Sequence, residues 1–194
     1  MTKNKELKIA GIVTLYNPTD DDIKNISTYI DDIDKLYIVD NTEGSDNKKR
    51  LPRNKKIEYI FKNENLGVAT AMNMGAEKAL KDGYKWLLTM DQDTTFKPGV
   101  MQKMKDVINS RDMKKIGIVT PWHHTKLIDK KPTEEFDDPH DVMTSGNLVN
   151  LEIWKKIGGY KDFFFIDGID IEYCMNLHKN GYKILRINSI EIDH

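Results

Sequence analysis

The sequence contains a single cysteine, no long apolar run and no excess of charge of either sign. With Cys174 alone, these 194 residues cannot form an intramolecular disulfide or a thiolate metal site, and a reducing compartment is expected. Thirty Lys and Arg residues against thirty-one Asp and Glu residues give a formal net charge of -1. The overall charge therefore favours neither nucleic acid nor an anionic membrane, and no nucleic-acid partner is expected.

Hydrophobic segments long enough to cross a membrane are also missing. No stretch approaches the roughly 20 apolar residues of a transmembrane helix, and the N-terminal apolar run is too short for a signal peptide. We expect a cytoplasmic protein, with peripheral association of a longer protein at the inner face of the membrane as an open option.

The length and composition fit one folded unit. With 39% hydrophobic and 31% charged residues, 194 residues are enough for one domain with a core, and we expect a single domain over residues 1–194. Because the sequence stops at "EIDH" without a closing helix or a polar tail, we expect this domain to be the N-terminal part of a longer protein.

Short apolar, β-branched runs alternate with amphipathic helical stretches. This alternation is typical of βαβ units and predicts an α/β fold with a mainly parallel sheet flanked by helices. The expected strands are residues 7–16, 35–40, 57–61, 85–90, 115–121 and 183–187. Ligands of such sheets bind beyond the carboxyl ends of the strands, so the residues that follow each apolar run are the candidates for a site.

Three amphipathic stretches predict helices. Residues 17–33 contain Thr19 as an N-cap, and residues 67–83 present one apolar face and stop at Gly83. Residues 170–182 end near Gly181, and their expected inward face consists of Ile171, Cys174, Met175 and His178. Residues 41–56 and 121–141 are expected to form long functional loops.

The stretch "LLTMDQDTTF" places Asp91 and Asp93 at the end of an expected strand. Side chains two residues apart on an extended segment point to the same face, so both carboxylates should address one ligand while Gln92 points away. Two carboxylates together with phosphate and water oxygens suit Mg²⁺ or Mn²⁺. A polar turn in which Asp and Thr side chains bond to the backbone is the open alternative.

Polar residues also follow two other expected strands. Asp40 comes directly after the second strand, and Asn63, Asn65 and Gly67 stand at the entrance to the helix at 67–83. Amide side chains and free N–H groups at a helix N-terminus suit a sugar or an anion. A solvated loop acid at Asp40, and a cap and turn at Asn65 and Gly67, are the open alternatives.

Six segments carry a family resemblance. In chain order they are "TLYNP", "IVDN", "NENLGVATAMNMG", "LLTMDQDTTF", "TSGNLVN" and "IGGYKDFFFIDGIDIEYCMNLHKNGYKI". Together they resemble the GT-A glycosyltransferases of family 2, and most closely the rhamnosyltransferase-like branch, from about residue 7 to residue 194.

The resemblance implies a fold and a reaction. The fold would be GT-A, the Rossmann-like fold of nucleotide-diphospho-sugar transferases. The reaction would be a metal-dependent, inverting transfer of a sugar, with rhamnose favoured, from a dTDP- or UDP-sugar to a saccharide or lipid-linked acceptor in cell-surface polysaccharide synthesis.

The resemblance also implies the residues of the donor side. Thr14, Tyr16 and Asp40 are expected at the base and ribose, and Asp91 at a ribose hydroxyl or a metal-bound water. The residues expected at the cation, Mg²⁺ or Mn²⁺, are Asp93, with Asp91 and His194 as further candidates. The expected nucleotide-sugar-binding set is completed by Asn63, Asn65, Gly67 and Asn73.

On the acceptor side, Asp170 matches the catalytic aspartate of the family. It is expected to take the proton of the acceptor hydroxyl as a general base, and a helix N-cap is its alternative role. Further residues expected on this side are Ser145, Gly146, Asp167 and Glu172. Arginines that often follow the catalytic aspartate in the family are absent here, so no phosphate contact is assigned to this helix.

Two other functions stay open. The stretch "LLTMDQDTT" also fits haloacid dehalogenase-like phosphatases, with Asp91 as nucleophile and Asp93 as acid and base, although three expected strands precede it here. The third option is a non-catalytic binder of nucleotide sugars with the same fold. The adjacent His123 and His124 are interpreted as loop residues rather than metal ligands.

Overall fold

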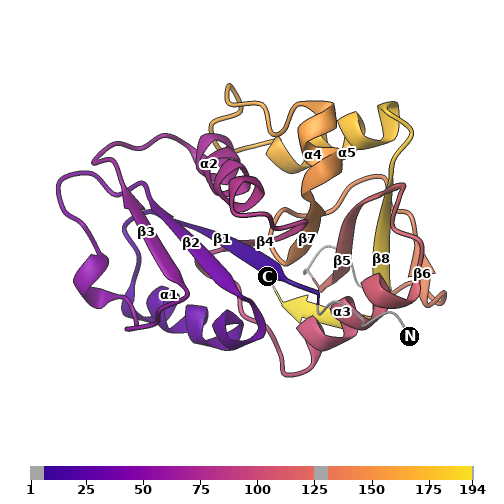
Figure 1. The fold of residues 1–194 in the computed structure, drawn as a ribbon, viewed down its shortest axis with the longest axis horizontal. Coiled ribbons are helices and arrows are strands. Elements are labelled where there is room, and N and C mark those ends of the chain that lie inside the picture. The colour runs from indigo at the N-terminus through magenta and orange to yellow at the C-terminus, as the bar shows by residue number, and fades with distance from the viewer. Residues whose placement is uncertain (1–6, 125–130, 194) are drawn as a thin grey trace.

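The computed structural model describes residues 7–124 and 131–193, which form one eight-stranded sheet with the order β3-β2-β1-β4-β7-β5-β8-β6 (Figure 1). Pairing is parallel between β3, β2, β1 and β4 and between β5 and β8, whereas β7 and β6 run antiparallel to their neighbours. The strands are β1 (Ile9–Leu15), β2 (Lys35–Asp40), β3 (Ile57–Phe61), β4 (Trp86–Asp91), β5 (Ile116–His124), β6 (Phe136–Asp137), β7 (Asn147–Asn150) and β8 (Lys183–Asp193).

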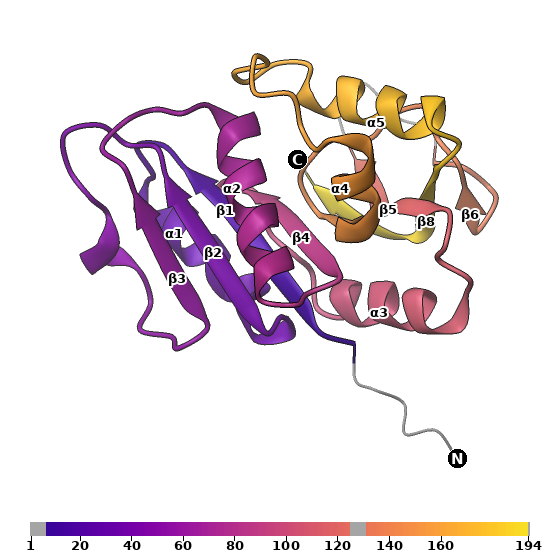
Figure 2. The same cartoon turned by 45° about the horizontal axis from the view of Figure 1, so that its top comes forward.

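Helices cover both faces of this sheet, as Figures 1 and 2 show. The α-helices are α1 (Asp20–Asn25), α2 (Val68–Lys81), α3 (Val100–Ser110), α4 (Leu151–Ile157) and α5 (Ile169–Lys179), and short 3-10 turns are η1 (Ile26–Thr28), η2 (Ile30–Asp32) and η3 (Lys48–Arg50). None of the helices in the described part of the chain is long and apolar enough to span a bilayer.

Two hydrophobic clusters, one on each face, hold these layers together. Alternate residues of β1 enter different clusters, because successive side chains of a strand point to opposite faces: Ile9 and Val13 pack with α1 and α3, and Ala10 and Ile12 with α2, α4 and α5. Every residue of β1 is buried, as expected for a central strand with helices on both sides.

The six expected strands and the helix expected at 67–83 are confirmed. That helix is α2, and Gly83 follows it with φ of 83°, a left-handed conformation that glycine adopts without strain. The expected helix at 17–33 is shorter than predicted. Thr19 does cap it in a capping box with Asp22, but α1 ends at Asn25 and 3-10 turns follow.

The hydroxyls beyond α1 offer a physical reason for its early end. Ser27 donates to the carbonyl of Lys24 and Thr28 to the carbonyl of Asn25, so side chains compete for the oxygens that a continuing helix would use.

The inward face predicted for residues 170–182 is wrong for two of its four residues. Ile171 and Met175 are 48% and 54% exposed, whereas the buried apolar residues of α5 are Ile169, Tyr173, Cys174 and Leu177. Ile169, Tyr173 and Leu177, each four residues apart, form a buried stripe along α5. The ring of Tyr173 packs on the ring of Tyr160, with centroids 4.5 Å apart.

The loop expected at 121–141 is partly strand. Trp122, His123 and His124 lie in β5, so their interpretation as loop residues is wrong. His123 is buried, and its Nε2 lies 2.7 Å from the carbonyl oxygen of Ser145. The elements α3, α4, β6 and β7 were not predicted.

Candidate active site

A cavity of about 500 Å³ opens at the carboxyl ends of β1 and β4. These strands are neighbours, and Thr14 pairs directly with Asp91 in the sheet register. The cavity is lined by Thr14, Tyr16, Val68, Asp91, Gln92, Asp93, Met143, Thr144, Ile166, Asp167, Gly168, Ile169 and Asp170. The cavity therefore lies at the carboxyl ends of the strands, where an α/β fold binds ligands, and it joins residues from five separate segments of the chain.

The aspartate pair lines this cavity, although by a different geometry from the one predicted. Strand β4 ends at Asp91, and the chain turns at once, with the N–H of Thr94 donating to the carbonyl of Asp91 at 3.3 Å. Gln92 does not point away: its Oε1 accepts the N–H of Tyr16 at 2.8 Å and its Nε2 donates to the Tyr16 carbonyl at 3.3 Å. Gln92 thus fixes the backbone of Tyr16 beside the two carboxylates.

Thr14 carries a polar group without a partner at this cavity. The residue is 8% exposed, and its hydroxyl has no hydrogen-bond partner among the described residues. A buried hydroxyl without a partner costs free energy unless a ligand or water completes its bonding. Thr14 is therefore placed and available for a polar ligand.

Asp40, which was expected at the nucleotide base, does not line the cavity. It is 1% exposed, and its carboxylate accepts from the N–H of Thr42 at 3.0 Å, from Nδ2 of Asn47 at 2.9 Å and from the hydroxyl of Tyr59. Burial acts to raise the pKa of this carboxyl, but the hydrogen bonds from Tyr59, Thr42 and Asn47 outweigh it and lower the pKa below the usual value. In this arrangement Asp40 holds the loop after β2, and its carboxylate is not exposed for contact with a nucleotide base.

The residues expected at the start of α2 likewise bond to the protein. Asn63 accepts the N–H of Gly44 at 2.7 Å, and Asn65 accepts the N–H of Gly67 at 3.1 Å. Asn73 donates to the carbonyl of Tyr160 at 2.8 Å and accepts its N–H at 3.0 Å. None of the four residues Asn63, Asn65, Gly67 and Asn73 lines the cavity.

Val68 and Asn73 of α2 hold the loop between α4 and α5. The N–H of Val68, next to Gly67, donates to the carbonyl of Phe165 at 2.7 Å, and Asn73 also donates to the carboxylate of Asp162 at 2.7 Å. This loop leads directly to Asp170. The polar residues of α2 therefore position the segment that carries the acidic residues of the acceptor side.

Ser145 and Gly146 also lie behind the cavity rather than in it. The Ser145 side chain is fully buried and its Oγ accepts the N–H of Asp91 at 2.9 Å. Gly146 has φ of 80°, and a Cβ there would lie 2.5 Å from Cδ1 of Ile192. Sequence reasoning missed the neighbouring Met143 and Thr144, which do line the cavity, and only their place beside "SGN" could have indicated them.

Of the acidic residues expected on the acceptor side, Asp167 and Asp170 line the cavity and Glu172 does not. The N-cap of α5 is Gly168, with φ of 78°, so the alternative role of Asp170 as the helix N-cap is wrong. One oxygen of Glu172 is buried without a hydrogen-bond partner in the described part of the chain.

The charged residues among the described lining of the cavity are all acidic. Asp91, Asp93, Asp167 and Asp170 contribute four carboxylates, and none of the described lining residues is Lys or Arg. A diphosphate would be repelled from such a cavity unless a cation entered with it.

The carboxylates of the cavity suit a cation that takes its other ligands from water and phosphate oxygens. Among residues 7–124 and 131–193, no group of three or more His, Cys, Asp or Glu side chains could hold a metal ion. Two carboxylates at Asp91 and Asp93 fit Mg²⁺ or Mn²⁺, which complete their shells with water and phosphate oxygens. His194, the third predicted ligand, lies outside the described residues.

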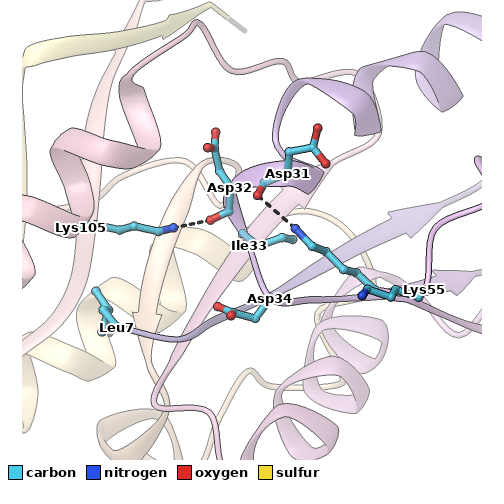
Figure 3. A pocket seen from close by; sticks show the side chains of 8 residues that line it. Leu7, Asp31, Asp32, Ile33, Asp34, Lys55 and Lys105 are labelled. Carbon is cyan, nitrogen blue, oxygen red and sulfur yellow. Dashed lines mark hydrogen bonds between the residues drawn. The ribbon is translucent and has the colours of Figure 1, made fainter. Parts of the chain in front are cut away.

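A second cavity, of about 390 Å³, lies at the amino ends of the strands and is shown in Figure 3. Lys105 donates there to the carbonyl of Asp32, and Lys56 to the carbonyls of Ile30 and Asp31 at 3.0 Å. These lysines satisfy the carbonyls of the turn before β2, so we assign them a structural role.

Comparison with known proteins identifies the family. The model of the family "Glycosyl transferase family 2" matches residues 20–157, which is more than half of the chain. A dTDP-rhamnosyl transferase, RfbF of Shigella flexneri, is 24% identical over 96% of this chain and 68% of its own length. An uncharacterized protein of Mycobacterium tuberculosis is 24% identical over 77% of this chain and 61% of its own length.

Solved structures show the same fold. A crystal structure of GalNAc-T7 with UDP, GalNAc and Mn²⁺ matches 98% of this chain and 44% of its own, with a TM-score of 0.77 and 13% identity. Residues 1–349 of Staphylococcus aureus TarS match 96% of this chain and 60% of their own, with a TM-score of 0.66 and 12% identity. The fold is therefore the expected GT-A fold, and the chain belongs to glycosyl transferase family 2.

Proposed function

We propose that the protein is an inverting, metal-dependent glycosyltransferase. It moves a sugar, with rhamnose favoured, from a dTDP- or UDP-sugar to a hydroxyl of a saccharide or lipid-linked acceptor in cell-surface polysaccharide synthesis. The observation that carries this proposal is the cavity at the ends of β1 and β4, which is lined by four aspartates and, among the described residues, by no Lys or Arg. The similarity to RfbF supports rhamnose, and the cavity supports a cation together with a diphosphate.

On the donor side, Thr14, Tyr16 and Asp91 contact the nucleoside, and Asp93 contacts the cation, with Asp91 and His194 as further candidates. The UDP and Mn²⁺ in the GalNAc-T7 crystal support this assignment. When bound, the cation neutralises charge on the departing nucleoside diphosphate. Asp40, Asn63, Asn65, Gly67 and Asn73 hold the loops around this site.

On the acceptor side, Asp170 is the general base. The acceptor oxygen forms a bond to the anomeric carbon, the bond from that carbon to the diphosphate oxygen breaks, and the acceptor proton passes to the Asp170 carboxylate. Attack from the face opposite the leaving group inverts the configuration. Asp167 lines the same cavity and positions the acceptor, whereas Glu172 lies outside the lining.

The phosphatase alternative finds no support. In that class the motif lies on the first strand, whereas Asp91 ends β4, and the family found for this chain is a glycosyltransferase family.

Release of nucleoside diphosphate from a panel of dTDP- and UDP-sugars, with Mg²⁺ or Mn²⁺ and mixed saccharide and polyprenyl-linked acceptors, tests the proposal. We expect Asp170→Asn to lower the rate by about a hundredfold or more while the donor Kd stays unchanged. The control Glu77→Gln, an exposed residue on α2, should match the wild type.

Each outcome has a distinct meaning. An Asp170→Asn protein with the wild-type rate would rule out Asp170 as the base. A wild-type protein that binds a donor but never releases the nucleotide is the non-catalytic binder, and a protein that binds no nucleotide sugar contradicts the proposed function altogether.

A further inference from the structure

A third cavity, much smaller than the two described above, is lined in part by Asp170. It is lined by Ile118, Val142, Thr144, Asn147, Tyr160, Asp170, Tyr173 and Cys174. Asp170 and Thr144 line both this cavity and the larger one, so they form the boundary between them. The centre of a water molecule can move within a volume of about 10 Å³ in the small cavity, so the cavity has room for one water.

Two buried polar atoms at this small cavity have no protein partner. Tyr173 is 1% exposed and Asn147 is 3% exposed. The Tyr173 hydroxyl and Oδ1 of Asn147 each have no hydrogen-bond partner among the described residues, although Nδ2 of Asn147 donates to the carbonyl of Met143 at 2.7 Å. Each such atom costs roughly 1–3 kcal/mol unless something completes its bonding.

Helix geometry brings Tyr173 close to Asp170. Residues three apart on a helix lie on the same face, so Tyr173 stands one turn beyond Asp170 on α5. The ring of Tyr173 is held by Tyr160, with centroids 4.5 Å apart. A hydroxyl held in this way cannot turn to another partner.

We propose that one ordered water occupies the small cavity, accepts a hydrogen bond from the Tyr173 hydroxyl and donates to Oδ1 of Asn147 and to the Asp170 carboxylate. One water has two protons and two lone pairs, so these three bonds satisfy both buried atoms at once. Tyr173 and Asn147 are then positioning residues, which act on Asp170 through the water.

The consequence for transfer rests on the proposed function. A water that donates to the Asp170 carboxylate fixes the orientation of the oxygens that take the acceptor proton. Other titratable groups surround Asp170: Asp91, Asp93 and Asp167 in the larger cavity, and Tyr160, Tyr173 and Cys174 in the smaller one. Burial raises the pKa of both tyrosines and raises the pKa of Cys174 to about 12, so these three stay neutral near pH 7.

A crystal structure of the full chain, at a resolution that shows ordered waters, tests the water itself. We expect density within hydrogen-bond distance of the Tyr173 hydroxyl, Asn147 Oδ1 and the Asp170 carboxylate. A dry cavity, or a water that does not reach Asp170, overturns the proposal. This outcome is independent of activity, so it decides the water even if no sugar is transferred.

Kinetics of Tyr173→Phe test the positioning role. The variant keeps the ring and loses only the hydroxyl, so we expect kcat to fall about tenfold with the donor KM unchanged.

The matched control is Tyr182→Phe, which removes a tyrosine hydroxyl at the far end of α5 and should behave as wild type. A folded Tyr173→Phe with the wild-type kcat, or one whose donor KM changes instead of kcat, overturns the positioning role. If that variant does not fold, the density in the wild-type crystal decides the proposal.

Discussion

Asp40 shows how one carboxylate can be structural where the sequence pattern suggests a ligand. Its carboxylate collects donors from Thr42, Asn47 and Tyr59, and Asn47 in turn accepts from Arg50 at 2.7 Å. These contacts organise the 41–56 loop beside the cavity. The folded state therefore needs Asp40 ionised.

The substitution Asp40→Asn should lower the free energy of unfolding by about 1–3 kcal/mol at pH 7, because an amide cannot accept from all these donors. The pKa of Asp40 is lowered on folding, so its contribution is present above the unfolded pKa of roughly 4 and is lost as pH falls through the folded pKa. In urea unfolding from pH 7 downward, the difference in free energy of unfolding between wild type and variant should become smaller below about pH 4.

The control for Asp40 is Glu43→Gln, an equal loss of charge at an exposed residue of the same loop. It should leave stability within about 0.5 kcal/mol of wild type. A gap for Asp40→Asn that stays constant down to acidic pH would contradict the role of the ionised carboxylate.

At the residue scale, the sequence indicated Asp91 and Asp93 by two carboxylates at the end of an expected strand, and Asp167 and Asp170 by the family resemblance alone. It could not separate them from Asp40, since the partners of Asp40 come from Thr42, Asn47 and Tyr59 and depend on how the loop folds back. Gln92 was misplaced for a similar reason, because the turn after Asp91 ends the alternation of an extended segment.

At the scale of elements, the contact between α2 and the loop from α4 to α5 holds the segment that leads to Asp170. Gly67 precedes α2 with φ of 76°, and a Cβ there would lie 2.7 Å from the carbonyl oxygen of Phe165. Gly83 follows α2 with φ of 83° and has no atom within 4 Å of such a Cβ. The two glycines share a positive φ, but a Cβ would clash with the protein only at Gly67.

Gly67→Ala should therefore destabilise the protein more than Gly83→Ala, by about 1–3 kcal/mol in urea unfolding. The difference reports the clash with Phe165 together with the backbone of residue 67, whose φ of 76° and ψ of 168° essentially only glycine adopts. We also expect faster proteolysis of the 160–168 loop in Gly67→Ala. Equal losses of stability in the two variants would show that this contact contributes little.

Elements with strong periodicity were the ones that sequence reasoning found. The β-branched runs and the stripe of α2 are long enough to be distinctive, whereas β7 has only four residues and α4 only seven. Helix α3 could have been found, since Val100, Met101, Met104, Val107 and Ile108 follow a helical spacing and are buried. The inward face of α5 depended on Tyr160, which no local pattern reveals.

At the scale of the whole molecule, the site exists because the sheet order places β1 beside β4 and β7 beside β4. The spacing of the segments along the chain does not predict that order. The family resemblance implied only the GT-A fold, and the structure gives the order of the strands. The extent of the domain and a continuation beyond residue 194 stay predictions. This chain spans 68% of the length of RfbF and 61% of that of the mycobacterial relative, so activity of the whole protein is a proposal.

The central claim is that the cavity of four carboxylates binds a nucleoside diphosphate only together with a divalent cation. Titration calorimetry of UDP and dTDP, with Mn²⁺ or Mg²⁺ and with a chelator, measures this directly. We predict binding of at least one nucleotide with metal and a loss of affinity of about tenfold or more with chelator, because four of the described lining residues are Asp and none of them is Lys or Arg. Equal affinity with and without metal, or no binding of either nucleotide with metal, would contradict the account.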